Sequence, residues 1–546
     1  MTRCHYLLGA GALLAVLVAT AGCEQQSGES GRPATTTATA TVALPGTGGA
    51  EQRALAMSHA YPARLDEAGP IHDRVAQFEA NRFVTTAEQP VSTFSIDVDT
   101  ASYTQLRKAI LEHGGQTLTS LPAATGLRTE EAVNYFSYDY ARPDDRQTPF
   151  AIDAAVMPAP WAPRHRILRI GVQGYDLPRT DRPALHLTFL VDVSGSMKGP
   201  DKLPLLQRAL AMLTAELEPR DRIALVTYAG SSAVVLEPTA VAERDAILDA
   251  VDALDAGGRT AGAAGLELAY RTARAMYDSD AINRVIIGTD GDFNVGPSSL
   301  EAMRALVRGK RDEGIYLSVL GFGTGNLRDD LMQQLAQHGQ GTAAYIDSVL
   351  EARKVLVEEM MRSVAPIADD VKIQVEFNPS RIASYRLIGY ETRLLQERDF
   401  NDDKVDAGEV GSGAAVTALY EIVPADARLS DERRYAGNRP SATTAEVSDE
   451  WAWVKLRFKA PGADTSRRLE RVVTDDDVWD DIAQAPQSLR FATAVAAFSQ
   501  KLRGEPALQD MAYDEIRALG LAARGADPAG HRAQFLQLVD LVAKQS

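Results

Sequence analysis

A short run of oxygen-bearing side chains follows an apolar stretch near the middle of the chain. Residues 185–191 are apolar in pattern, and the sequence DVSGS (192–196) comes directly after them. Its carboxylate and two hydroxyls stand at alternating positions, and the intervening glycine permits a turn tight enough for them to converge. Mg²⁺ prefers such hard oxygen ligands, at about 2.0–2.1 Å in an octahedron that keeps several waters. The run therefore predicts a divalent-cation site that contains Asp192, Ser194 and Ser196.

The elements around this run predict how it is positioned. Between residues 183 and 365, short apolar runs without polar alternation are separated by helical patterns. This rhythm predicts a doubly wound α/β domain with a largely parallel sheet covered on both faces. Residues 233–236 follow the second strand after a short turn and predict an antiparallel edge strand. Ligands of open α/β sheets bind at the carboxyl ends of the strands, which is where Asp192 stands.

The segment with these features resembles the von Willebrand factor A family. That family's metal-ion-dependent adhesion site begins with D-x-S-x-S and adds a Thr from a second loop and an Asp from a third. Thr260, which follows the glycines of a loop before a helix, and Asp290, at the end of a strand, match those two positions. The resemblance implies that Asp192, Ser194, Ser196, Thr260 and Asp290 hold Mg²⁺, or another divalent cation such as Mn²⁺ or Ca²⁺. It also implies an open coordination position for an acidic side chain of a protein partner.

Simpler interpretations exist for the same residues. Asp192 and Ser194 are both good helix N-cap residues, but capping explains one or two residues of the set and not all five. Asp292 and Asn294 lie in the third loop, where we expect a turn with solvated polar groups.

The segments on either side of this domain resemble the flanking domains of a bacterial group of envelope proteins that carry the same A domain. The resemblance rests on FSIDVDTASY, EEAVNYF and YDYARP before it, and on GYETRLL, DFNDDKVDAGEVGSG and VTALYEI after it. We expect a mixed α+β domain over 56–182, with helices at 102–113 and 130–140 and two strands around a proline-rich turn at 158–163. The A domain then spans 183–365, and a β-sandwich-plus-helices domain spans 366–546.

The N-terminus has the composition of an export signal. Arg3 precedes an apolar run at 7–18, which is too short to span a bilayer of ~30 Å. The ending T-A-G-C resembles a bacterial lipoprotein signal, which implies that residues 1–22 are removed and that Cys23 is lipidated and anchors the protein to a membrane. The alternative is a secretory signal with an incidental cysteine. Residues 23–55, rich in Gly, Ser, Thr, Ala and Pro, predict a flexible tether. Glu24, in place of the Asp that retains some lipoproteins in the inner membrane, favours the periplasmic face of the outer membrane.

Composition excludes several classes of function. The 546 residues suggest three or four domains at about 150 residues each. The net charge is −17 and no basic stripe with interleaved aromatics occurs, so we predict no nucleic-acid partner. The two cysteines, Cys4 and Cys23, both lie at the N-terminus, so the remainder has neither disulfides nor a thiol nucleophile.

Several other motifs carry less weight. Asp99-Thr100-Ala101-Ser102 is similar to an aspartic-protease motif but lacks its glycine and a second copy. The acidic stretch 399–410 lacks the Gly and the bidentate Glu of an EF-hand, which leaves an irregular calcium loop or an ordinary solvated turn. Trp451 and Trp453 alternate on a predicted strand, which favours sheet packing over a sugar platform.

These features predict a lipid-anchored, non-enzymatic protein of the cell envelope that binds a protein partner through the metal site. Two alternatives remain open: an assembly factor that works with an AAA+ ATPase, and a hydrolase hidden in the C-terminal region.

Overall fold

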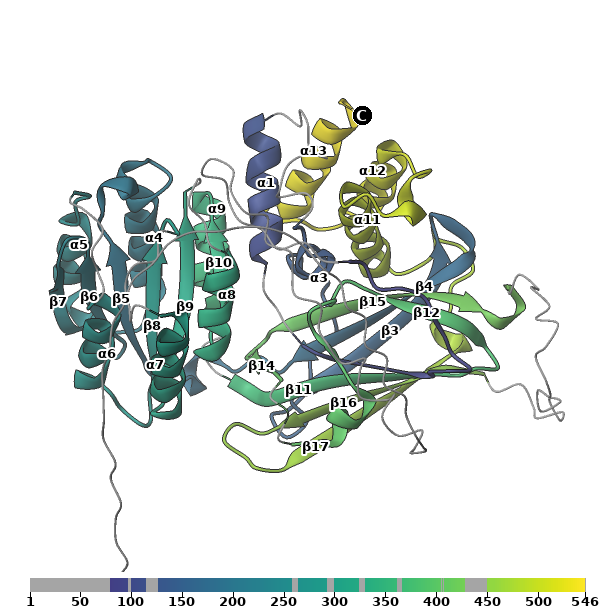
Figure 1. Cartoon of the computed structure of the whole chain (residues 1–546), viewed down its shortest axis with the longest axis horizontal. Helices are drawn as coiled ribbons and strands as arrows, with labels where there is room; N and C mark the ends of the chain where they lie inside the picture. Colours follow the sequence, from purple (N-terminus) through teal and green to yellow (C-terminus); the bar gives the residue numbers. More distant parts are fainter. Residues whose placement is uncertain are drawn as a thin grey trace, which may run out of the picture. The chain divides into compact units, whose positions relative to one another are not determined.

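The computed structural model describes residues 79–96, 100–113, 126–257, 264–291, 299–323, 329–360, 366–403, 405, 407–427 and 449–545. They form a central α/β domain, two antiparallel sheets and a group of helices (Figure 1). None of the described helices is long and apolar enough to cross a membrane.

The central domain contains a six-stranded sheet in the order β10-β9-β8-β5-β6-β7. The strands are β5 (Leu185–Asp192), β6 (Arg222–Tyr228), β7 (Ser232–Ala240), β8 (Ile282–Thr289), β9 (Ile315–Phe322) and β10 (Ala343–Ile346). All neighbouring pairs are parallel except β6 and β7, so the predicted doubly wound α/β class and its antiparallel edge are confirmed.

Helices cover both faces of this sheet (Figure 1). They are α4 (Leu203–Glu216), α5 (Arg244–Asp252), α6 (Gly265–Ala275), α7 (Leu300–Asp312), α8 (Asp329–His338) and α9 (Val349–Ala352), which continues as a π-helix over Arg353–Glu359. Phe189 and Val191 of β5 pack with α4, α5 and α9, whereas Leu190 packs with α6, α7 and α8. Both faces of β5 are therefore buried, as expected of a strand covered on two sides. A side chain at Gly288 would collide with Leu206, so this glycine allows α4 to lie close to the sheet.

The two antiparallel sheets combine strands from before and after the α/β domain. One has the order β1-β12-β15-β4-β3, and the other has the order β13-β2-β11-β16-β17 with β14 beside β11. Before the domain lie β1 (Val84–Thr85), β2 (Val91–Ser95), β3 (Phe150–Ala159) and β4 (Ala162–Gly174). After it lie β11 (Pro366–Phe377), β12 (Ile382–Ile388), β13 (Leu394–Leu395), β14 (Gly408–Gly411), β15 (Ala415–Pro424), β16 (Glu450–Lys459) and β17 (Ser466–Thr474). β2 pairs with β11 and β4 pairs with β15, so the α/β domain is inserted between strands that share sheets.

The apolar faces of these two sheets enclose one core. It includes Phe94 of β2, Leu168 of β4, Val375 of β11 and Tyr420 of β15, all fully buried. The predicted strand pair around the proline-rich turn is confirmed as the β3–β4 hairpin.

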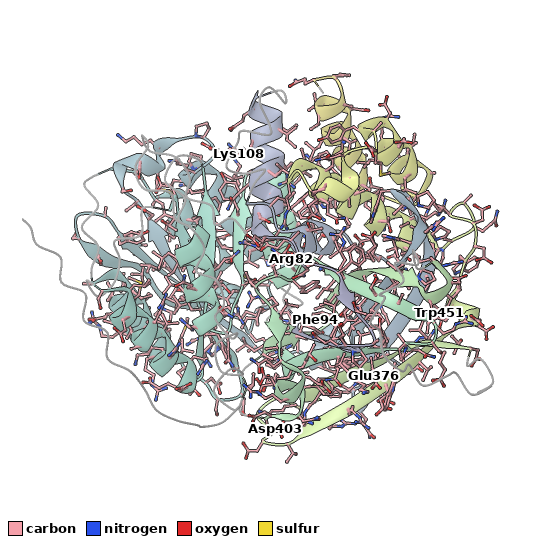
Figure 2. The ribbon with its side chains drawn as sticks, turned by 45° about the vertical axis from the view of Figure 1, so that its right-hand side comes forward. Arg82, Phe94, Lys108, Glu376, Asp403 and Trp451 are labelled. Atoms are coloured by element: carbon pink, nitrogen blue, oxygen red, sulfur yellow. The ribbon has the colours of Figure 1, made fainter. Side chains whose placement is uncertain are left out.

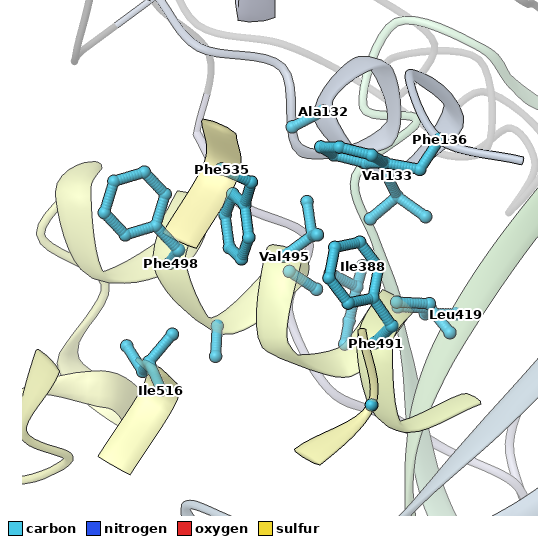
Figure 3. Packing of buried hydrophobic residues seen from close by; sticks show 14 of the residues in the cluster. Ala132, Val133, Phe136, Ile388, Leu419, Phe491, Val495, Phe498, Ile516 and Phe535 are labelled. Carbon is cyan, nitrogen blue, oxygen red and sulfur yellow. The ribbon is translucent and has the colours of Figure 1, made fainter. Parts of the chain in front are cut away.

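A separate core holds the helices of the flanking segments. These are α1 (Ala101–His113), α3 (Thr129–Asn134), α11 (Gln487–Leu502), α12 (Tyr513–Ala522) and α13 (His531–Ala543). Phe491 of α11 packs against Phe136, with ring centroids 5.2 Å apart, and against Phe535, at 5.6 Å, and these two rings also contact each other at 5.8 Å (Figure 3). Aromatic rings in edge-to-face contact bury large apolar areas, so the segment after α3 is held against the C-terminal helices.

The helix expected over 130–140 is shorter in the structure. α3 ends at Asn134, whose side chain donates to the Thr417 carbonyl at 3.1 Å and accepts from the Thr417 amide at 2.7 Å. Asp139 then adopts a positive φ of 50°. The helical pattern of apolar residues continues past Asn134. The helix nevertheless ends there, where the Asn134 side chain bonds the backbone of β15.

Candidate functional site

The site is formed where three parallel strands end at the same edge of the sheet. β5 ends at Asp192, which lies opposite Tyr228 at the end of β6. On the other side of β5, Val191 lies opposite Gly288 of β8, and Asp290 follows that strand. The parallel register therefore brings Asp192, Tyr228 and Asp290 together, at the edge where ligands of α/β sheets bind.

Asp192 is fully buried and its carboxylate is held on both oxygens. Oδ1 accepts from the Ser194 amide at 2.8 Å, and Oδ2 accepts from the Tyr228 hydroxyl at 3.0 Å. These two donors fix the direction of the carboxylate before any ligand arrives.

The two serines of the first loop lie within hydrogen-bonding distance of each other. The Oγ atoms of Ser194 and Ser196 are 2.8 Å apart, and Ser194 is buried whereas Ser196 is exposed. A 3₁₀-helix over Gly195–Lys198 follows Ser194, but the Ser194 side chain makes no capping hydrogen bond with it. Capping therefore does not account for this serine, and its hydroxyl remains next to that of Ser196.

Asp290 is almost fully buried, and its two oxygens differ in their surroundings. Oδ2 accepts from the Lys202 ammonium at 2.8 Å. Oδ1 is buried and receives no hydrogen bond from any described residue. Burial of a carboxylate oxygen without a hydrogen-bond donor destabilises the folded protein. Such an oxygen is therefore a candidate for contact with a cation or a water molecule.

Burial and charge act together on the pKa of Asp192. Burial raises the pKa of its carboxyl above the usual value, and the charge of Asp290 adds to that rise, although the bonds from Ser194 and Tyr228 oppose it. Burial also raises the pKa of the Tyr228 hydroxyl well above its usual range, with the Asp192 charge contributing. Tyr228 therefore stays a neutral hydrogen-bond donor, and the two carboxylates share one poorly solvated space.

The structure relates the second loop to the first by a backbone hydrogen bond. The Gly257 amide donates to the Val193 carbonyl at 2.8 Å. Thr260, three residues further on, lies outside the described residues, as do Asp292 and Asn294 of the third loop and Cys23 at the N-terminus. Their expected roles stay predictions.

Sequence reasoning missed two residues of this site, Tyr228 and Lys202. Tyr228 was discoverable in principle, because it ends the second predicted strand and parallel strands end at one edge. No spacing rule indicates Lys202, because its side chain reaches Asp290 only through the path of the loop that precedes α4.

The donor set fits a hard divalent cation. Two carboxylates and two hydroxyls are oxygen ligands of the kind that Mg²⁺ and Ca²⁺ take. In the described part of the chain, no group of three or more His, Cys, Asp or Glu side chains is placed to hold a metal. A cation at this edge would therefore depend on the serine hydroxyls and on further ligands such as water or a partner's carboxylate.

The rim of the site is attached to a flanking helix. Lys108 of α1 is labelled in Figure 2. It forms an ion pair at 2.9 Å with Asp201, the neighbour of Lys202, and donates to the Tyr345 hydroxyl at 3.1 Å. The helix α1, which precedes the α/β domain in sequence, thus contacts the loop that contributes Lys202.

The acidic stretch 399–410 is neutralised by basic side chains where the structure describes it. The Lys372 ammonium donates to the carbonyls of Asp399 and Asp402, at 3.1 and 2.6 Å, and Arg457 pairs with Asp403 at 3.1 Å. The Lys372 ammonium thus already bonds two of the carbonyl oxygens of this stretch.

The two tryptophans lie on β16 among cations. Lys455 lies 3.9 Å from the ring centroid of Trp453, and Arg381 lies 4.8 Å from that of Trp451. Trp451 is buried, with its indole donating to Asp475 at 2.7 Å. The expected role in sheet packing is confirmed for Trp451, which belongs to the core between the two sheets.

Three protein families match successive parts of the chain. Residues 186–358 match the von Willebrand factor type A domain, residues 71–169 match a family described as von Willebrand factor, and residues 362–544 match the C-terminal domain of the uncharacterized protein YfbK. Together they cover most of the described residues.

Relatives extend this similarity. The uncharacterized protein YfbK of Escherichia coli is 39% identical over 481 residues, which cover 87% of this chain and 82% of that protein. The uncharacterized protein sll0103 of Synechocystis is 31% identical over 189 residues, which cover 34% of this chain and 43% of that protein. Among solved structures, a von Willebrand factor type A protein from Catenulispora acidiphila aligns with 75% of this chain and 98% of its own, at 17% identity and a TM-score of 0.39.

Proposed function

Because the chain belongs to the YfbK family and contains its von Willebrand factor type A domain, we propose that it binds a protein partner through a divalent cation at the carboxyl edge of the α/β sheet. Asp192, Ser194, Ser196, Thr260 and Asp290 would hold the ion, with Mg²⁺ as the first candidate and Mn²⁺ or Ca²⁺ as substitutes. When bound, the ion would supply a Lewis-acidic position that an Asp or Glu of the partner completes.

The observation that carries the proposal is the state of the two buried carboxylates. Asp192 is oriented by two hydrogen bonds and lies within the influence of the Asp290 charge, and Asp290 Oδ1 is buried without a donor from any described residue. Two buried carboxylates, of which Asp192 has its pKa raised by burial and by the charge of Asp290, are arranged for a cation. The hydroxyls of Ser194 and Ser196, one buried and one exposed, lead from this space towards the surface.

The proposed role is binding without turnover. A partner carboxylate bound by the ion would be held by charge and geometry, and neither the ion nor the partner is consumed. We place this binding in the cell envelope, with Cys23 as the lipidated anchor, on the strength of the signal-like N-terminal sequence.

The proposal is tested by capture of a partner from envelope extract with the protein lacking residues 1–23. The capture is done with wild type and with Asp192→Asn, each in Mg²⁺ and in EDTA. We expect one partner to be retained only by wild type in Mg²⁺, and a charge-reversing substitution of one acidic residue in that partner to abolish retention. If the amount of captured partner changes neither with EDTA nor with Asp192→Asn, the proposal is contradicted and binding is assigned to the flanking segments.

A further inference from the structure

Lys202 stands at the metal-binding edge and is already bound to one of its two carboxylates. Its ammonium lies 2.8 Å from Asp290 Oδ2, and the side chain of Lys202 is only 14% exposed. A partly buried ion pair of this geometry is held much more firmly than a surface pair. Lys202 therefore belongs to the site through its ion pair with Asp290.

Gly323 gives room for the aliphatic part of the Lys202 side chain, and the Lys202 ammonium pairs with Asp290. Gly323 has a positive φ of 78°, and a Cβ on it would lie 2.3 Å from Lys202 Cε. The adjacent acid, Asp201, forms its ion pair with Lys108 of α1 at 2.9 Å, and the charge of Lys202 acts on Asp201 without an ion pair between the two. Among the described residues, Asp290 is thus the carboxylate that Lys202 contacts by an ion pair.

Lys202 contacts only one of the two carboxylate oxygens of Asp290. Lys202 takes Oδ2 and thereby turns Oδ1, which no described residue hydrogen-bonds, into the oxygen left for a cation. Asp192 and Asp290 contribute two negative charges and Lys202 one positive charge, so these three residues sum to −1. A dication raises the sum to +1, and one carboxylate returns it to zero.

We propose that Lys202 is a built-in counter-ion of the site: it positions Asp290, weakens metal binding by its like charge, and leaves the loaded site with a positive charge that one carboxylate neutralises. This inference rests on the proposed function and names a residue that sets both metal affinity and the preference for an acidic partner. In a partly buried site, the repulsion between an ammonium and a dication outweighs the orienting effect of one hydrogen bond. Removing the charge should therefore tighten metal binding.

The test is calorimetric titration of Mg²⁺ and of Mn²⁺ into wild type, Lys202→Met and Lys198→Met. Lys198 precedes the same helix as Lys202, is exposed and forms no ion pair with Asp290 in the described part of the chain, so its substitution removes the same charge without removing a contact to Asp290. We expect Lys202→Met to bind metal roughly tenfold more tightly than wild type, and Lys198→Met to bind as wild type does. Lys202→Gln serves as a second neutral variant if Lys202→Met fails to fold.

A thermal unfolding measurement separates this role from a merely structural one. Loss of Lys202 leaves Asp290 unpaired, so we expect a lower melting temperature in EDTA and a larger rise on adding Mg²⁺ than in wild type. A structural role alone would lower the melting temperature equally in both conditions, and that result would overturn the inference.

The outcomes distinguish this inference from the proposed function. If wild type binds metal but Lys202→Met binds it equally or more weakly, the inference fails and the proposed function stands. If wild type binds neither metal, both fail.

Discussion

At the scale of single residues, the site depends on buried carboxylates whose directions are fixed in advance. Asp192 is oriented by the Ser194 amide and the Tyr228 hydroxyl, and Asp290 is oriented by Lys202. Preorganised donors lower the reorganisation needed when a ligand binds, but they leave charge in a poorly solvated space. Ligand binding then relieves a cost that the apo protein bears.

Substitution of Asp192 tests that cost. Asparagine retains an oxygen for one of the two hydrogen bonds but removes the charge, and burial raises the pKa of the wild-type carboxyl, so its ionised form is disfavoured in the folded state. We expect Asp192→Asn to lose Mg²⁺ affinity by more than about tenfold, a loss of at least about 1.4 kcal/mol, while its melting temperature in EDTA is unchanged or higher.

Saturating Mg²⁺ at about 100 times its Kd should stabilise wild type by about 2.7 kcal/mol. Differential scanning calorimetry with and without Mg²⁺ measures both effects. A variant that unfolds in EDTA would show that Asp192 is needed for folding.

The sequence identifies part of this site and not the rest, for a physical reason. Asp192 and Asp290 could be placed at one edge because they end predicted parallel strands, whose carboxyl ends meet. Lys202 could not, because a loop side chain acquires its partner only when the loop path and the glycine at 323 are known. Tyr228 could have been placed at the same edge because it ends the second predicted strand, but its pairing with Asp192 also required the register of β5 against β6.

At the scale of elements, buried ion pairs attach the flanking helices to the α/β domain. Arg107 of α1 binds Asp347 at 2.5 Å and Glu351 of α9 at 2.9 Å, with all three side chains at most 6% exposed. The Tyr135 hydroxyl joins this group by donating to Glu351 at 2.6 Å. A buried charged group is stable only while its partners remain, so these contacts bind α1 to the C-terminal end of the domain.

Removal of Arg107 would take away the cation that forms ion pairs with both buried carboxylates. We expect Arg107→Met to lower the free energy of unfolding by about 3–5 kcal/mol. Glu112→Gln, on the same helix but 47% exposed and 3.8 Å from Lys108, should change it by about 0.5 kcal/mol or less. Urea denaturation of the three proteins measures the difference. Equal midpoints for wild type and Arg107→Met would contradict a structural role for this ion-pair group.

A second contact of the flanking helices is sensitive to pH. Burial, with the charges of Glu391 and Glu131 adding to it, raises the pKa of Glu130 on α3 from 4.5 to about 7. Gly389 makes room for this side chain, since a Cβ there would lie 2.6 Å from Glu130 Oε2. The folded protein therefore holds a proton that the unfolded chain releases between these two values.

The sign of the pH effect follows from that difference. Because the folded-state pKa is higher, stability falls as the pH rises from 4.5 to about 7 and stays lower above it. We expect Glu130→Gln to be more stable than wild type by about 1–3 kcal/mol near pH 8, with the difference vanishing near pH 4.5. Denaturation at both pH values, with the exposed Asp144→Asn as a control that changes neither, tests this. A variant less stable than wild type near pH 8 would contradict it.

At the scale of the whole molecule, the α/β domain is an insertion between strands that belong together. Phe94 of β2 lies opposite Ile373 of β11, and Leu168 of β4 lies opposite Tyr420 of β15. The sequence indicates each strand by local alternation, but pairing across more than two hundred residues has no local signal. This is why the flanking segments were expected as two domains, whereas their strands share two sheets.

Truncation distinguishes the self-contained part from the interdependent parts. We expect residues 183–365 alone to fold, because the parallel sheet is complete within them, although with lower stability because Asp347 and Glu351 lose Arg107. A second fragment, residues 56–365, should aggregate. Without β11 and β15, its strands β2 and β4 would expose unpaired edges. Circular dichroism and size-exclusion chromatography of both fragments measure this. A monomeric, folded 56–365 fragment would contradict the shared-sheet arrangement.

The central claim is a divalent cation between Asp192 and Asp290, and anomalous scattering from crystals grown with Mn²⁺ tests it most directly. We predict an anomalous difference peak within coordination distance of Asp290 Oδ1 and of the Ser194 and Ser196 hydroxyls, lost in crystals of Asp192→Asn. A map without a peak at this edge, or with a peak only at another acidic surface such as residues 399–403, would contradict the account.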